Sequence, residues 1–91
     1  MSEIDVLLIE LQRLLTELKD SRRSEELKAH IIRLFSRVNL IIEQTDDVEE
    51  MERIFKDAAK VAGMASYLMD KEPEVREFLQ LLGIPVEEVK N

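Results

Sequence analysis

The stretch LKAHIIRLFSRVNLII, residues 27–42, decides the fold of this chain. Its apolar residues recur every three or four positions, which is the repeat of an α-helix, and they fall on two sides of that helix. The main side carries Leu27, Ile31, Leu34, Phe35, Val38, Ile41 and Ile42, and the other side carries Ala29, Ile32, Ser36 and Leu40. A helix that is apolar on two sides is usually buried on both. We therefore expect a central helix that contacts neighbours front and back, with a surface groove or a dimer contact as the alternative.

The composition predicts an all-α protein. The chain has 91 residues, which suits a single domain over residues 1–91. Aromatic residues make up 4% of it, and only two glycines and two prolines occur, whereas sheet proteins use more β-branched, aromatic and turn residues. There is no cysteine, which excludes disulfides, thiolate metal sites and cysteine nucleophiles.

Start and stop signals divide the chain into about five helices, approximately 3–20, 25–44, 47–71, 73–82 and 85–90. Ser2, Ser24 and Asp46 or Asp47 are N-cap candidates, because each precedes acidic residues and an apolar repeat. Pro73 suits a first helical position, while Gly83 suits the residue after a helix end. Unequal lengths predict a compact, irregular helical bundle.

The helix expected over 47–71 has an apolar face and a small-residue centre. We assign its core face to Val48, Met51, Phe55, Ala59 and Ala62, widened by Ile54, Ala58, Ala65 and Met69. Gly63 costs about 1 kcal/mol relative to Ala inside a helix. We therefore expect a kink or a close helix contact at Gly63.

The helix expected over 3–20 has a strong core face and two apolar residues behind it. Ile4, Leu8, Leu11, Leu15 and Leu18 repeat with helical spacing, and Val6 and Ile9 lie on the opposite side. Our main expectation is that these two residues, like Ile32 and Leu40, are buried within the chain. If instead Val6, Ile9, Ile32 and Leu40 are exposed together, they form a candidate surface for a partner's amphipathic helix or a homodimer.

Charge and hydropathy constrain the partners. The net charge is −7, which argues against nucleic acid, since phosphate neutralisation supplies much of that affinity. No apolar run reaches the roughly 18 residues of a membrane span, and MSEIDV lacks the basic start of a signal peptide. We expect a soluble cytoplasmic protein without a membrane partner, and a monomer that requires no partner.

His30 is the one histidine, and its position predicts a half-buried boundary residue. The segment AHIIRLFS resembles the histidine-phosphotransfer domains, four-helix bundles in which the phosphorylated histidine is followed by a basic residue at i+3 and a glycine at i+4. Arg33 matches the basic residue, but Leu34 replaces the glycine that would let a partner approach. His30 is therefore a remote phosphoacceptor candidate.

The acidic segment TDDVEEME, residues 45–52, does not predict a metal site. It lacks the alternating ligand pattern of a calcium loop, and helix capping with i,i+4 ion pairs accounts for its acids. We expect no metal, no cofactor and no catalytic residue.

The agreement of all these signals resembles the style of de novo designed helical proteins. Every expected helix has a recognisable boundary, and exposed faces carry Glu, Lys and Arg. Natural proteins usually break one or two local rules at a working site. The resemblance implies a designed structural scaffold with no enzymatic activity, and the alternative is a natural helical interaction module.

Overall fold

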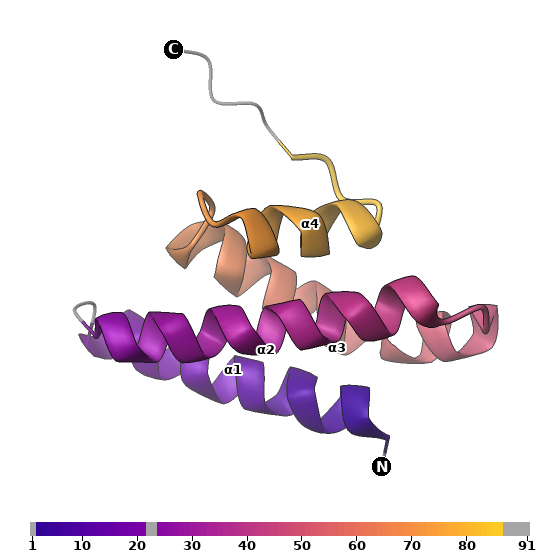
Figure 1. Cartoon of the computed structure of the whole chain (residues 1–91), viewed down its shortest axis with the longest axis horizontal. Coiled ribbons are helices and arrows are strands. Elements are labelled where there is room, and N and C mark those ends of the chain that lie inside the picture. The colour runs from indigo at the N-terminus through magenta and orange to yellow at the C-terminus, as the bar shows by residue number, and fades with distance from the viewer. Residues whose placement is uncertain (1, 22–23, 87–91) are drawn as a thin grey trace.

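The computed structural model describes residues 2–21 and 24–86, and these residues form four α-helices without a strand (Figure 1). The helices are α1 (Glu3–Ser21), α2 (Glu25–Gln44), α3 (Val48–Leu68) and α4 (Pro73–Leu81). The all-α class is therefore confirmed. The observed α1, α2 and α4 agree with the expected ranges to within one residue at each end.

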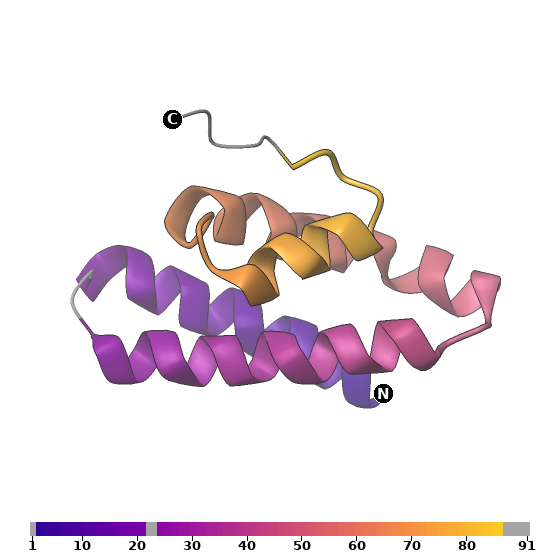
Figure 2. The same ribbon diagram turned by 45° about the horizontal axis from the view of Figure 1, so that its top comes forward.

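The four helices form a closed ring of contacts. α1 and α2 run antiparallel beside each other, as both views show (Figures 1 and 2). α1 also packs against α3, and α4 packs against both α2 and α3. The shortest extent of the molecule, 19 Å, matches two layers of helices about 10 Å thick each. The helix at 25–44 thus has two helical neighbours, α1 and α4. The second apolar side that we expected to be buried is nevertheless mostly uncovered, because Ala29, Ser36 and Leu40 are exposed and only Ile32 is half-buried.

The core lies inside this ring and takes apolar side chains from all four helices. Phe35 of α2 and Phe78 of α4 are fully buried, with their ring centroids 5.1 Å apart, and tilted aromatic pairs at this distance attract each other. Asn39 is the one buried polar residue among those described. The buried apolar residues include Ile4, Leu8, Leu11, Leu15, Ile31, Val38, Ile54, Ala58, Val61, Ala65 and Val75.

Ser24 and Asp47 cap their helices as the sequence predicts, whereas the Ser2 hydroxyl donates to the Asp5 carboxylate instead of accepting from a backbone N–H. The Ser24 side chain accepts a hydrogen bond from the Leu27 backbone N–H at 3.0 Å, and Asp47 accepts one from the Glu50 N–H at 3.2 Å. At the start of α1 the Asp5 carboxylate accepts from the Ser2 backbone N–H at 3.0 Å. These bonds satisfy donors that the first helical turn cannot pair internally.

The end of α4 has the backbone geometry of a Schellman cap. Gly83 has a φ of +75°, a conformation that costs other L-residues energy through their Cβ. The Ile84 N–H donates to the Leu79 carbonyl at 2.9 Å, and the Gly83 N–H donates to the Gln80 carbonyl at 3.0 Å. The predicted helix stop at Gly83 is thereby confirmed.

Two expected helix boundaries are wrong. α3 ends at Leu68 rather than near residue 71, because the buried Met69 leaves helical geometry and the chain must turn before Pro73. The expected fifth helix is not formed at Pro85 and Val86, and the rest of its range, residues 87–90, lies outside the described residues.

Gly63 also differs from expectation. It lies on the exposed side of a continuous α3, and a Cβ at this position would meet no other element within 4 Å. The close contact expected here is absent, because the helices approach α3 on the face of Ala58, Val61, Ala62 and Ala65 instead.

Two ion-pair groups connect the helices at the surface. Arg37 of α2 donates two hydrogen bonds to Glu3 of α1, at 2.8 and 2.9 Å. Arg53 of α3 donates to Asp5 of α1 at 2.9 and 3.0 Å and also pairs with Glu50. Hydrogen bonds from Arg53 and then from Ser2 hold the pKa of Asp5 well below its usual range.

Candidate functional site

His30 lies on the exposed side of α2 rather than at a half-buried boundary. The expectation was wrong because α1 and α4 contact α2 on the flanks of Ile31, Phe35 and Val38 and leave the position of His30 uncovered. Among the described residues, no hydrogen bond or ion pair involves its side chain. A catalytic histidine needs a group that orients it, and no such group is in place.

The apolar residues behind α1 and α2 are mostly not buried. Val6, Ile9 and Leu40 are half-exposed, so our expectation that the chain buries them is wrong. Ile32 is half-buried and packs against the core. It shares a side of α2 with Asn39, seven residues later, whose amide donates to the Glu74 carbonyl of α4 at 2.9 Å. Ile32 therefore faces α4, whereas Leu40 faces outward.

These four residues do not form one groove. The Glu3–Arg37 ion pair joins α1 to α2, with Val6 one turn after Glu3 and Leu40 one turn after Arg37. Because the helices run in opposite directions (Figure 2), Val6 and Leu40 lie on opposite sides of this pair. At about 1.5 Å of rise per residue they are about 9 Å apart along the helix axes. Val6 and Ile9 are neighbours one turn apart on α1, but both are separated from Leu40 along the helix axes, so the four residues do not make one continuous apolar surface.

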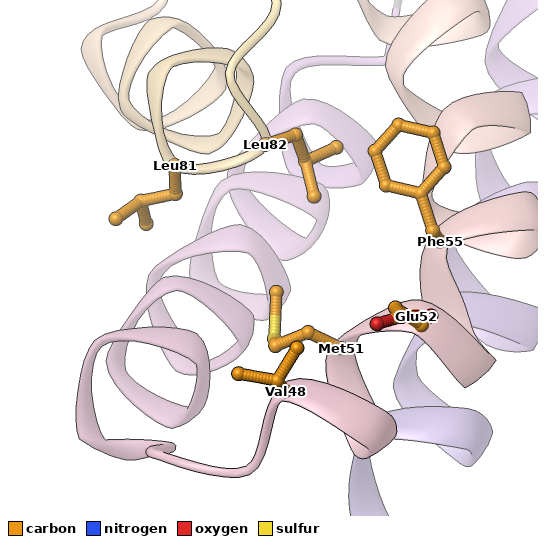
Figure 3. Close-up of a pocket in the computed structure, with 6 residues that line it drawn as sticks. All are labelled: Val48, Met51, Glu52, Phe55, Leu81 and Leu82. Atoms are coloured by element: carbon orange, nitrogen blue, oxygen red, sulfur yellow. The ribbon is translucent and has the colours of Figure 1, made fainter.

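A different apolar surface is continuous, and we name it the α3–α4 pocket. It has a volume of about 480 Å³ and lies between the first turns of α3 and the end of α4. Five of its lining residues are apolar and one is acidic: Val48, Met51, Glu52, Phe55, Leu81 and Leu82. In Figure 3 the side chain of Leu82 points toward the ring of Phe55, and Met51 reaches up from α3 beneath them.

Two apolar residues of the α3–α4 pocket have side chains that are exposed to solvent. Val48 is 68% exposed and Phe55 is 46% exposed, while Met51, Leu81 and Leu82 are half-buried and pack against the core. Burying an exposed side chain of this size is worth about 1.5–3 kcal/mol. The pocket therefore retains apolar surface that the fold itself does not use.

The sequence placed Val48 and Phe55 in the core, and that assignment was wrong. The buried face of α3 is centred on Ile54, Ala58 and Ala65, so Val48 and Phe55 fall at its edge. α3 has 21 residues and α4 only nine, and a nine-residue helix is about 13 Å long. The sequence could have predicted from this difference in length that α4 would leave part of the apolar face of α3 uncovered.

A pair of acidic residues lies where α2 meets α4. A hydrogen bond with Glu43 of α2 raises the pKa of Glu77, and partial burial and the Glu43 charge raise it further. The nearby charge of Glu74 also raises this pKa, whereas the Asn39 amide lowers it. Glu77 lies one helical turn before Leu81 of the pocket. Glu52 in the pocket lining and Glu77 one turn before the lining residue Leu81 are thus both acidic.

The geometry offers little for catalysis or metal binding within residues 2–21 and 24–86. No three Asp, Glu or His side chains of this part of the chain converge closely enough to hold a metal ion. A second hollow of about 400 Å³ is lined by Leu18, Lys28, Tyr67 and Leu68. Lys28 is the one charged residue in this lining, which contains no acidic residue to pair with it. In the described part of the chain, no helix combines the length and the apolarity that crossing a bilayer requires.

Comparison with known proteins assigns neither a family nor a function to this chain. No family model matches the chain, and no curated protein or solved structure is significantly similar to it. A function therefore has to be argued from the residues themselves.

Proposed function

We propose that this chain is a structural scaffold: a stable all-α domain of the designed type, with no enzymatic activity. The observation that carries the proposal is the composition of the core. Every buried side chain among the described residues is apolar except that of Asn39. All of these buried residues lie in the four helices, apart from Met69, which directly follows α3. Such a core supports a single packed structure and leaves no buried polar group arranged for chemistry.

The surface charges support the same proposal, because several of them hold helices together. Glu3–Arg37 and Asp5–Arg53 join α1 to α2 and to α3, and the acids of Asp47, Glu49 and Glu50 lie at the start of α3, where the helix dipole favours negative charge. These structural roles explain why the five acidic residues are present, so no catalytic role is needed to explain them.

Thermal unfolding followed by circular dichroism tests the scaffold proposal. Designs with regular helix signals and a well-packed core are typically hyperstable, with midpoints above roughly 90 °C, whereas mesophile domains melt at about 45–65 °C. We expect one cooperative transition in the higher range. A midpoint in the lower range would instead favour a natural domain.

A natural interaction module is the second candidate, and the exposure of Val6, Ile9 and Leu40 is the observation that favours it. Its test is substitution of Ile9 by Ser in a binding assay with an amphipathic peptide. Loss of binding would support this surface. Because Leu40 lies apart from Val6 and Ile9 along the helix axes, we expect no loss.

Histidine phosphotransfer remains a remote proposal. A low-molecular-weight phosphodonor would label an active phosphoacceptor, and His30→Gln would abolish the label. We expect no label at His30, since no described side chain orients its ring.

A further inference from the structure

The α3–α4 pocket has the composition of a binding surface. Exposed apolar residues are ordinary when they occur singly, but a contiguous group marks an interaction site more often than chance. Here Val48, Met51 and Phe55 from α3 converge with Leu81 and Leu82 from α4 on a single hollow (Figure 3). Pockets that bind ligands have this character, mostly apolar with a few polar groups.

The walls of the pocket suit a helix rather than an extended strand. Both walls are helical, so no sheet edge is present among the described residues to pair with an added strand. Recognition of a helix in a groove uses apolar anchors at i, i+3, i+4 and i+7 of the bound helix. Val48, Met51 and Phe55 offer a complementary row, because they are three and four residues apart on α3.

The charges around the pocket decide which helix would fit. Residues 43–57 contain seven acids and two bases, and one base, Arg53, already pairs with Asp5 and Glu50. Glu52 lines the pocket itself, and Glu49 is exposed beside Val48. Glu77, one turn before Leu81, lies against Glu43 of α2 and within 3.5 Å of the Asn39 amide nitrogen, so a cation placed beside this acidic pair would be attracted to it.

A second copy of this chain is a poorer occupant. Two pockets brought face to face would oppose acidic borders on chains of net charge −7. Juxtaposed like charges disfavour association, whereas opposite charges speed encounter and fix orientation.

We infer that the α3–α4 pocket docks the apolar face of a cationic amphipathic helix from a partner protein. Phe55, Val48 and Leu82 contact its apolar residues, and Glu52, Glu43 and Glu77 face its Lys and Arg side chains. This inference goes beyond the scaffold proposal, since a stable scaffold can exist with or without a partner.

Titration with three synthetic peptides of about 20 residues tests the inference on the full chain. The first carries Leu at i, i+3, i+4 and i+7 with Lys elsewhere, the second replaces Lys by Glu, and the third is a scramble of the first. We expect saturable binding of the cationic amphipathic peptide, at least tenfold tighter than binding of either other peptide. Absence of binding, or equal binding of the scramble, would overturn the inference.

Variants locate the binding surface. Phe55→Ser should weaken binding of the cationic peptide at least tenfold, and Glu52→Lys combined with Glu77→Lys should shift preference toward the anionic peptide. Ile9→Ser is the matched control, because it removes a similarly exposed apolar residue on α1 and should leave binding unchanged. Circular dichroism verifies that each variant is folded. Unchanged binding by Phe55→Ser, or a dimer that this variant dissociates, would contradict docking of a partner helix.

Discussion

Gly63 and Gly83 are the two glycines of this chain, and their surroundings give them opposite roles. Gly63 lies inside α3 with open space where a Cβ would be. Gly83 has a φ of +75° in the cap that ends α4. Glycine therefore slightly lowers the stability of the helix at position 63, whereas the backbone conformation at position 83 requires it.

Substitution of each glycine by alanine should show this difference. Gly63→Ala should raise the free energy of unfolding by up to about 1 kcal/mol, since alanine has the higher helix propensity. Gly83→Ala should lower it by about 1–2 kcal/mol, because its Cβ opposes the left-handed conformation. Urea unfolding measures both. A destabilising Gly63→Ala would mean that α3 has a close neighbour at this position.

Asn39 is the residue that departs from the apolar core, and the helix repeat did not single it out. It is 2% exposed, its amide donates to the Glu74 carbonyl, and no described group donates to its Oδ1. A buried polar atom without a partner costs free energy. The one hydrogen bond fixes how α2 meets α4, which is a role in structural specificity.

Asn39→Asp should lower the free energy of unfolding at neutral pH by roughly 1–3 kcal/mol. The change keeps the side-chain shape but removes the donor to Glu74 and adds a negative charge near Glu77. Gln44→Glu is the control, because it adds the same charge at an exposed position of α2 and should have little effect. Equal effects in urea unfolding would contradict the assigned role of Asn39.

At the scale of elements, the contact of α2 with α4 and the contact of α1 with α3 depend on pH with opposite signs. Glu77 has a raised pKa, chiefly through Glu43, so the contact between α2 and α4 is most favourable in acid and weakens as the pH rises through that pKa. Asp5 has a lowered pKa, chiefly through Arg53, so its contribution is present above the usual aspartate pKa and is lost as the pH falls through the lowered value.

Glu77→Gln should therefore raise the urea midpoint at neutral pH, with a gain that disappears in acid. The groups that face this position are Glu43, Glu74 and Asn39, and glutamine removes the charge that Glu43 repels. Asp5→Asn is the comparison, because it should lower the midpoint at neutral pH and approach the parent chain in acid. Both variants are read from urea curves at several pH values, and changes of the same sign at neutral pH would contradict this account.

At the scale of the whole molecule, a charge of −7 and scattered apolar side chains favour a single chain in solution. Light scattering after size exclusion should give a mass near 10.6 kDa. Like-charged surfaces repel, and Leu40 lies too far from Val6 and Ile9 for the three to supply one apolar contact. A mass of two chains would contradict this prediction and would show that an exposed apolar surface of the chain mediates dimerisation.

The helix boundaries were determined by the sequence because their causes are local. Ser24, Asp47, Pro73 and Gly83 act on backbone groups within one or two turns, so their positions are sufficient to place three helix starts and one stop. The end of α3 was one exception, because the turn after Met69 depends on where α4 must pack, and the expected fifth helix was another.

Burial was decided by the tertiary structure. Phe55 and Ile54 are neighbours of similar hydropathy, yet Ile54 is buried and Phe55 lines the α3–α4 pocket. The difference depends on how far the nine residues of α4 extend along α3, and the meeting of Glu43 with Glu77 depends on the same packing. Helix periodicity gives the direction of a side chain from its own axis, but only the distance to the next helix determines whether water is excluded.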